Sequence, residues 1–390
     1  MKVIKRFSLI IAVMIISLSV AVLAGCKEQD KPADATPEKI EDMIGRVVEV
    51  TPGSYNRVVC IGAGALRIYS YIGDVSKLCG IEDIENTTLE NRPKMFDSAA
   101  RPYVLANKDV FNAISSSCGV GGPNAQTAEA EKILSCNPDI VISEYEDVEK
   151  ENALQAQLGV PVITVKYGSS GVFDENVAKT FTLLGKIFAK ESRASELNAF
   201  IANQKELIQN RVKDVKEEDK KSVYICGLGN WGTTNHLMTA QNYAPFNVAK
   251  IKNVVTDLAK DGIQAIEYEK LVALGDKIDI MIIDSAAVKN IKPLYKENAT
   301  LFDDIKAWQN GEVYLEMAYN AYYTNLEIAL INTWYIAKVV YPELFSDIDI
   351  TVKTNEVTNA FLGKNLATEI YACPASFGGY QKIDTASFFN

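Results

Sequence analysis

The chain has 390 residues, of which 48% are hydrophobic and 23% are charged, so it is long enough to bury two cores. Its formal net charge is −10, and an acidic surface argues against nucleic acid or an anionic membrane face as a partner. A single histidine is too few for a cage of imidazoles around bare zinc or manganese.

The first 25 residues have the pattern of a secretory signal peptide. Lys2, Lys5 and Arg6 precede an apolar run over residues 9–22, which is too short for a membrane span and ends in small residues. Leu-Ala-Gly-Cys at 23–26 resembles a bacterial lipobox, which implies cleavage before Cys26 and a lipid on its thiol. The alternative is a plain signal peptide with an incidental cysteine. We expect an extracytoplasmic protein, lipid-anchored to the cell membrane, whose net charge falls to −13 because three positive charges are removed.

Cysteine spacing gives no sign of a metal site. Beyond Cys26 there are six cysteines, with neither a CxxC pair nor a dense disulfide framework. Cys60 and Cys226 lie in apolar, strand-like runs, where small buried thiols are common. We therefore expect no zinc centre.

The first half of the mature chain has the pattern of an α/β lobe. Residues 27–42 are charged and contain two prolines, so residues 26–54 are assigned to a membrane tether, and the N-terminal lobe to residues 55–172. The succession of strands, loops and helices favours parallel pairing. Strands are predicted over 57–61, 77–81, 138–142 and 161–165, and helices over 66–73 and 125–135.

Two glycine turns follow predicted strands. Gly62 and Gly64 lie where backbone N–H groups could meet an anion, although a tight strand-to-helix turn also needs glycine. Arg67 occupies the place of the third glycine of a dinucleotide fingerprint. Residues 227–232 match G-x-G-x-x-G, but loop-like residues follow. We predict no nucleotide site.

Residues 174–218 predict a long helix between two lobes. Val177, Phe181, Leu184 and Phe188 recur at spacings of four, three and four, with a charged opposite face. A single helix of some forty residues would span roughly 60 Å. The alternative is two ordinary helices with a break near 190–192. Either way, residues 173–219 are assigned to an interlobe spine helix.

The strand pattern resumes after the spine. Strands are predicted over 222–226, 278–283 and 311–315, and a helix over 326–340, so a C-terminal α/β lobe is assigned to residues 220–340. Residues 341–390 are expected to form terminal helices that pack back on the lobes. Asp284, at a strand end, is either a carboxylate ligand or a turn former.

These segments together resemble the class III periplasmic binding proteins, the substrate-binding lipoproteins of ABC uptake transporters for chelated iron, haem and cobalamin. The resemblance implies an α/β fold of two Rossmann-like lobes, with mostly parallel sheets, bridged by one long helix. It implies a monomer that delivers cargo to a permease dimer with a cytoplasmic ATPase. It is carried by residues 61–67, 80–83, 101–107, 119–123, 137–141, 232–236, 243–246, 319–327 and 334–343.

The sequence departs from the family in a loop expected to face the ligand. Relatives often have Gly-Ala-His-Gly where this chain has Thr-Asn-His-Leu at 234–237, and proline where it has Ala244. These departures bear on the ligand rather than on the fold.

The expected cargo is a metal that its chelator already satisfies, such as a ferric siderophore, haem or a cobalamin-like complex. Arg67 and Arg101 would bind its anionic groups, unless they form ordinary salt bridges. His236 is a candidate metal ligand, although a lone histidine is more often structural. Flat aromatic faces would come from Tyr103, Tyr145, Trp231, Tyr319, Tyr322 and Tyr323, with Tyr167 at another strand end.

Three other functions compete with chelate uptake. An oxyanion receptor for molybdate or tungstate could use the two glycine loops and Arg67. A hydrolase is disfavoured because His236 is the one candidate base and no Gly-x-Ser-x-Gly elbow occurs. An adhesin or sensor would not need a cleft. We expect no enzymatic activity, and no covalent group other than the lipid on Cys26.

Overall fold

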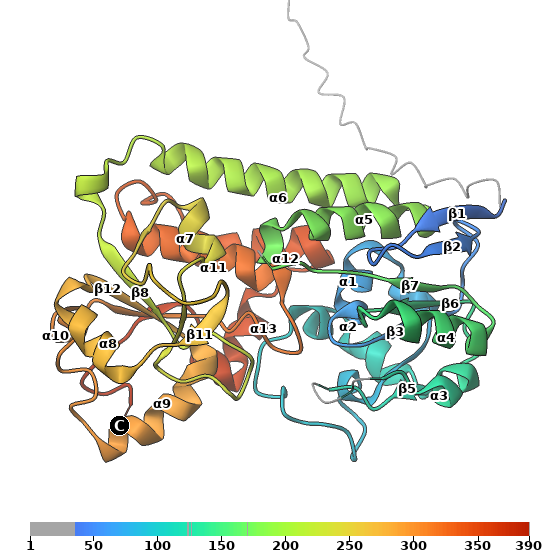
Figure 1. Cartoon of the computed structure of the whole chain (residues 1–390), viewed down its shortest axis with the longest axis horizontal. Helices are drawn as coiled ribbons and strands as arrows, with labels where there is room; N and C mark the ends of the chain where they lie inside the picture. The colour runs from blue at the N-terminus through green and yellow to red at the C-terminus, as the bar shows by residue number, and fades with distance from the viewer. Residues whose placement is uncertain (1–35, 123–124, 126, 170, 390) are drawn as a thin grey trace, which may run out of the picture.

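The computed structural model describes residues 36–122, 125, 127–169 and 171–389. The predicted signal peptide, Cys26 and the start of the tether lie outside the described residues. Two α/β lobes lie side by side beneath one long helix, α6 (Glu191–Val212), as Figure 1 shows. Among the described residues, no helix is long and apolar enough to cross a membrane.

The N-terminal lobe is built on a five-stranded parallel sheet with the strand order β5-β4-β3-β6-β7. The four strands predicted here all occur, because each is a short, buried apolar run. The strands are β3 (Val58–Ile61), β4 (Leu78–Glu82), β5 (Ser117–Gly119), β6 (Ile140–Ser143) and β7 (Val162–Thr164). The helices are α1 (Ala65–Ile72), α2 (Pro102–Ala113), α3 (Ala130–Ser135) and α4 (Val148–Leu158).

The C-terminal lobe repeats this architecture. Its main sheet has the order β10-β8-β12-β13-β14, parallel except for β14, and a two-stranded sheet pairs β9 with β11. The strands are β8 (Ser222–Cys226), β9 (Met238–Ala240), β10 (Lys252–Asn253), β11 (Ile263–Ala265), β12 (Ile280–Asp284), β13 (Val313–Glu316) and β14 (Gln381–Lys382). The helices are α7 (Ala244–Val248), α8 (Tyr268–Leu274), α9 (Ser285–Glu297), α10 (Lys306–Gln309) and α11 (Leu326–Val340).

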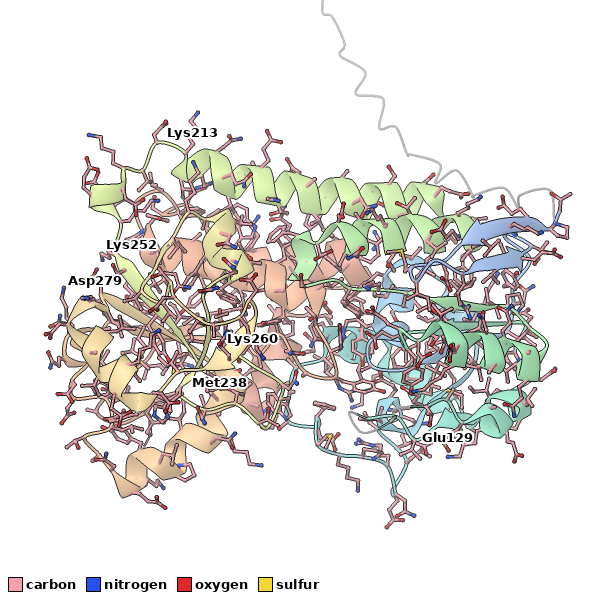
Figure 2. The ribbon with its side chains drawn as sticks, in the orientation of Figure 1. Glu129, Lys213, Met238, Lys252, Lys260 and Asp279 are labelled. Atoms are coloured by element: carbon pink, nitrogen blue, oxygen red, sulfur yellow. The ribbon has the colours of Figure 1, made fainter. Side chains whose placement is uncertain are left out.

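The chain end returns to the N-terminal lobe before it completes the C-terminal sheet. Helix α12 (Ile350–Leu362) places Phe361 against Tyr71, with ring centroids 5.0 Å apart. Lys364 then donates to the carbonyl of Ala106, and α13 (Ala367–Ala372) contacts α2. The terminal segment therefore ties the two lobes together. Charged side chains such as Lys213 and Lys252 point outward from the assembled molecule (Figure 2).

The predicted tether is wrong over its second half. Strands β1 (Glu38–Glu41) and β2 (Val47–Val50) form an antiparallel hairpin that packs on the N-terminal lobe. Ile40, Val48 and Val50 are buried there, and the guanidinium of Arg46 donates to the carbonyl of Val162. The hairpin is thus part of the folded lobe.

The predicted single spine helix is also wrong, and the alternative of two helices is confirmed. Helix α5 (Glu175–Ile187) ends before Ala189, whose φ of 51° is left-handed, and α6 begins at Glu191. Helix α5 runs back beneath α6 (Figure 1), where the Asn198 amide donates to the carbonyl of Ala178 at 3.1 Å. Of these two helices only α6, about 33 Å long, runs between the lobes.

We predict that Gly185→Ala destabilises the protein by about 1–3 kcal/mol, because overpacking forces neighbours apart. A Cβ on Gly185 would lie 2.7 Å from the Cβ of Ala194, at the contact between α5 and α6. Denaturant unfolding measures the effect. Lys179→Ala, on the exposed face of the same helix, is the control, with a change within about 0.5 kcal/mol. If the denaturation midpoints of the Gly185→Ala and Lys179→Ala proteins were equal, the close packing of α5 against α6 at Gly185 would be contradicted.

Candidate functional site between the lobes

The main candidate site is a cavity of about 280 Å³ between the lobes, which we call the interlobe pocket. The N-terminal lobe contributes the segment after β7, and the C-terminal lobe contributes loops at the carboxyl ends of its strands. None of the lining residues carries a formal charge. They are Gly168, Ser169, Gly171, Val172, Phe173, Asn230, Ala240, Asn242, Tyr243, Ala244, Pro245, Gly262, Ile263, Tyr319, Asn320, Tyr323, Thr324, Ala329 and Thr333.

Three tyrosines give the pocket its aromatic surface. Tyr243 lies beside Tyr319 with ring centroids 6.4 Å apart, and Tyr323 packs on Tyr167 at 4.7 Å. Tyr243 donates to the buried carboxylate of Glu316 at 2.9 Å. The hydroxyls of Tyr319 and Tyr323 have no hydrogen-bond partner that the structure describes, so they are available to a ligand.

The loop over residues 319–325, which we call the tyrosine loop, forms one wall of the pocket. It closes on itself through an Asn320–Thr324 bridge and a bond of 2.7 Å from the Asn325 N–H to the Tyr319 carbonyl. Tyr322 and Tyr323 both have positive φ, 52° and 69°. Residues with side chains adopt such angles only when their surroundings fix them. Contacts with residues outside the tyrosine loop must therefore stabilise its backbone conformation.

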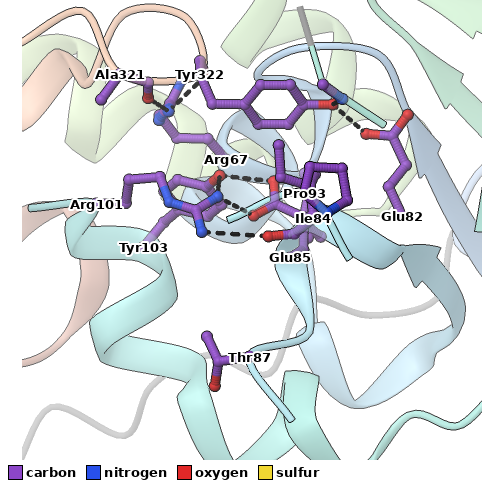
Figure 3. A network of polar contacts seen from close by, with 12 residues as sticks. Arg67, Glu82, Ile84, Glu85, Thr87, Pro93, Arg101, Tyr103, Ala321 and Tyr322 are labelled. Atoms are coloured by element: carbon purple, nitrogen blue, oxygen red, sulfur yellow. Dashed lines mark hydrogen bonds and ion pairs between the residues drawn. The ribbon is translucent and has the colours of Figure 1, made fainter. Parts of the chain in front are cut away.

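Arg67 holds the tyrosine loop and does not line the pocket. Its side chain is fully buried, and Nη2 donates to the carbonyls of Ala321 and Tyr322 at 2.9 and 2.8 Å (Figure 3). Nη1 donates to Tyr167 at 3.3 Å. The expectation that Arg67 binds ligand anions does not fit this position, because the side chain is buried away from the pocket and both of its terminal nitrogens are hydrogen-bonded within the protein.

Arg101 and Tyr103 are likewise turned into the protein. Arg101 forms an ion pair with Glu85 at 2.7 Å, and the Tyr103 hydroxyl donates to the other oxygen of Glu85 at 2.6 Å (Figure 3). All three side chains are buried. Burial and the nearby Glu85 raise the pKa of Tyr103 well above its usual value. This cluster, at the start of α2, does not line the pocket.

The remaining predicted site residues lie apart from the pocket. Tyr145 lines a separate shallow cavity against α4. Trp231 donates from Nε1 to the carbonyl of Met95 at 2.9 Å, across the two lobes. His236 is buried beside Phe302 at 5.8 Å, and burial lowers its pKa. A metal-binding role for His236 does not fit this aromatic setting.

A buried carboxylate occupies the first glycine turn. Glu82 accepts from the N–H of Gly62 at 3.1 Å and from the hydroxyl of Tyr322 at 2.5 Å, a bond between the lobes (Figure 3). Burial raises the pKa of Glu82 to about 7, against the opposing effect of these hydrogen bonds. The place where an external anion could meet this turn is thus taken by the protein itself.

Two further carboxylates lie behind the pocket in the C-terminal lobe. Asp284 and Glu316 are partners in the register of β12 and β13, and neither is exposed. Asp284 caps α9 through the Ala286 N–H at 2.8 Å. Burial raises the pKa of Asp284 to about 8 and that of Glu316 well above its usual value. In the described part of the chain, no group of three or more His, Cys, Asp or Glu side chains could hold a metal ion.

Sequence reasoning did not single out several residues that line the pocket. Tyr243 was named only within residues 243–246, one of the segments that carry the family resemblance. Asn230 and Asn320 were not predicted as site residues. The segment 168–173 follows a predicted strand and is rich in glycine and serine, which is typical of a loop at the carboxyl end of a parallel strand. Its position at the carboxyl end of a strand is the signal from which these pocket residues could have been predicted. Tyr319 and Tyr323, by contrast, were expected at the site and do line the pocket.

Two α/β lobes around a neutral interlobe pocket define a binding protein for a small solute, and comparison with known proteins gives its family. Residues 58–317, more than half of the chain, match the family described as periplasmic binding protein, so the chain belongs to that family. Its members are substrate-binding transport proteins of ABC transporters rather than enzymes, and they act outside the cytoplasm. The class III fold predicted from the sequence is confirmed.

Individual relatives differ in what they bind. The molybdate-binding protein MolA of Haemophilus influenzae is 23% identical over 388 residues, covering 92% of this chain and 96% of its own. A periplasmic solute binding protein from Veillonella parvula has a TM-score of 0.67 at 19% identity, over 91% of this chain and all of that one. Helicobacter pylori CeuE with Ni(II) bound has a TM-score of 0.58 at 18% identity, over 85% and 98%. At these identities the structures support the fold alone.

We predict that Arg101→Ala lowers the free energy of unfolding by about 3–5 kcal/mol, because it leaves Glu85 buried without its counter-ion. Chemical denaturation measures the loss. Lys132→Ala, which breaks the exposed pair with Glu129, is the control and is expected to cost at most about 1 kcal/mol. An Arg101→Ala protein of normal stability would show that the pair is not needed for the fold.

We predict that stability falls as the pH rises from about 5 to 8. The folded pKa of Glu82 lies above its unfolded value, so the unfolded chain releases its proton first and unfolding becomes easier across this window. Glu144 and Asp284, with pKa values raised to about 8 by burial, act in the same direction. Thermal unfolding across the range measures the slope. Glu82→Gln should reduce it, whereas Glu49→Gln, at an exposed position, should not. A higher melting temperature at pH 8 than at pH 5 would refute this account.

Proposed function

We propose that this protein captures a chelated metal complex in the interlobe pocket and delivers it to the permease of an ABC transporter. The observation that supports this proposal most strongly is the lining of the pocket, which has three tyrosines and several amides but no charged side chain. Such a surface offers flat faces and hydrogen bonds without ligating a metal strongly. The chelator must then satisfy the metal, as in a ferric siderophore, haem or a cobalamin-like complex.

The size of the pocket supports a ligand larger than a simple ion. Its volume of about 280 Å³ corresponds to roughly nine water molecules at about 30 Å³ each. A tetrahedral oxyanion carries only four oxygens around its central atom. The pocket can therefore enclose a compact complex, or one part of a larger complex that extends between the lobes.

An oxyanion such as molybdate is the second candidate cargo. It is favoured by the molybdate-binding relative that matches almost the whole chain. Ser169, Thr324 and Asn230 could offer neutral donors to it. Two observations argue against an oxyanion as the cargo. No lining residue of the pocket is cationic, and Arg67 is hydrogen-bonded to the tyrosine loop. For these two reasons we propose the chelated metal complex ahead of the oxyanion.

The remaining parts of the proposal follow the family. The protein would act as a monomer outside the cytoplasm, held to the membrane by a lipid on Cys26. Its partner would be a permease dimer with a cytoplasmic ATPase. The lobes are linked by α6, by the terminal segment and by the tyrosine loop, so we expect modest closure around cargo rather than a wide hinge motion.

Tyr323→Ala is predicted to weaken binding of the cargo by at least about tenfold, because it removes an aromatic wall of the pocket. Tryptophan fluorescence can follow titrations with ferric siderophores, haemin, cobalamin and molybdate, since Trp231 joins the lobes. Tyr145→Ala is the matched control, because Tyr145 lies in a different cavity. A response to molybdate alone would replace the chelate with the oxyanion. If Tyr323→Ala and Tyr145→Ala weakened binding equally, the interlobe pocket would not be the binding site.

A further inference from the structure

A long loop of the N-terminal lobe lies between the two lobes. Residues 86–101, all within the described part of the chain, form neither helix nor strand between η2 (Asp83–Glu85) and α2. In Figure 1 this blue-green segment lies between the lobes on the side away from α6. Connections longer than about 12–15 residues without secondary structure of their own are usually lids or binding loops. We call residues 87–99 of this loop the strap.

The strap has internal structure and a fixed base. Arg92 donates to both carboxylate oxygens of Asp97, at 2.7 and 2.8 Å, which is the strong bidentate form of an ion pair. At the start of the strap, Thr87 donates from its N–H and from its hydroxyl to the side-chain oxygen of Asn112 in α2, both at 2.9 Å. The strap can therefore move as one unit about this base.

The tip of the strap is bound to the C-terminal lobe. Trp231 donates from Nε1 to the carbonyl of Met95 at 2.9 Å. The buried ring of Phe96 packs on Tyr322 of the tyrosine loop, with ring centroids 5.6 Å apart. These two contacts join the strap to two different loops of the other lobe.

The strap is supported less completely by its own lobe. An open cavity of about 280 Å³ lies between the strap and α2, with Phe96 on one side and Val104 and Leu105 on the other. A segment with few contacts beneath it opens at low cost. The position of the strap therefore depends on contacts outside its own lobe, which also include a bond of 2.9 Å from the Ala375 N–H to the Ser98 carbonyl.

The loops that hold the strap also form walls of the interlobe pocket. The Trp231 N–H donates to the carbonyl of Asn320 at 3.2 Å, and the Nδ2 of Asn320 donates to the side-chain oxygen of Asn230 at 3.0 Å. Asn230 and Asn320 both line the pocket. None of the strap residues, all of which are described, lines the pocket itself. The strap thus supports two pocket walls from behind.

We propose that the strap is a latch that holds the lobes closed, and that its release from Trp231 and Tyr322 lets cargo enter and leave. The proposal rests on the proposed function and specifies how the interlobe pocket is opened. Because the strap offers the cargo no contact, its release should change the rates of binding and dissociation rather than the affinity.

Limited digestion with trypsin tests the latch without any cargo. Lys94 is an exposed residue of the strap, and trypsin can cut after it once the strap has left Trp231. Trp231→Phe removes the Nε1–H donor and keeps an aromatic ring, so it should speed this cleavage about fivefold. Mass spectrometry identifies the cut. Leu89→Ala, which changes an exposed side chain of the same strap, should leave the rate unchanged.

The pattern of cuts separates release of the strap from unfolding of the protein. Unfolding would speed cleavage at sites throughout the chain, whereas release of the strap speeds it at Lys94 alone. Phe96→Ala, which removes the packing on Tyr322, should have the same local effect and serves if Trp231→Phe is unstable. Equal cleavage rates after Lys94 in the wild-type protein and in these variants would overturn the proposal.

Stopped-flow fluorescence with haemin and cobalamin tests whether the latch controls access to the pocket. Both probes absorb light and quench Trp308 and Trp334, which remain in Trp231→Phe. In this variant the association and dissociation rate constants should each rise about fivefold, while the dissociation constant changes by less than about threefold. Leu89→Ala should alter neither rate.

The outcomes distinguish this inference from the proposed function. If Trp231→Phe is cut faster after Lys94 but both rate constants are unchanged, the strap does not control access and the inference fails while the proposed function stands. If neither haemin nor cobalamin binds the wild-type protein, the proposed chelate loses its support, and the cleavage rates still decide whether the strap is a latch.

Discussion

The rest of the site depends on the hydrogen bonds between the N-terminal lobe and the tyrosine loop. Arg67 donates to two backbone carbonyls of this loop, and Glu82 accepts from Tyr322. The same loop presents Tyr319 and Tyr323 to the pocket. Because one short segment makes both sets of contacts, the relative position of the lobes and the shape of the pocket are set together. The positive φ angles of Tyr322 and Tyr323 are retained only because these bonds hold them.

Much of the fold could be predicted because it depends on local patterns. Buried strands such as β8 and β12 are uninterrupted apolar runs, and α11 has the predicted bounds, which Pro342 helps to define. The hairpin over residues 38–50 was missed because its strands have only four residues each, and β1, Glu-Lys-Ile-Glu, has a single apolar residue behind a proline-containing segment. The break between α5 and α6 was expected only as the alternative to one long helix, because neither glycine nor proline marks it. Ala189 adopts the left-handed turn, which the packing of the two helices must stabilise.

The candidate site was less predictable, because partners distant in sequence decide where a side chain points. Arg67 and Arg101 were reasonable ligands for anions until the fold brought them to the Tyr322 carbonyl and to Glu85. His236 lies in a loop, as expected, but Phe302 from a remote segment buries it. Tyr319 and Tyr323 follow β13 and line the pocket, whereas Arg101, Tyr103 and Tyr145, which were expected there by the same strand-end rule, do not.

Both lobes use internal carboxylates where a binding protein for anions would keep free donors. In the N-terminal lobe, Glu82 accepts a hydrogen bond from the N–H of Gly62 in the first glycine turn, and in the C-terminal lobe Glu316 accepts one from the hydroxyl of Tyr243. The Gly62 N–H and the Tyr243 hydroxyl are therefore both bonded within the protein and are not free to bind an anion.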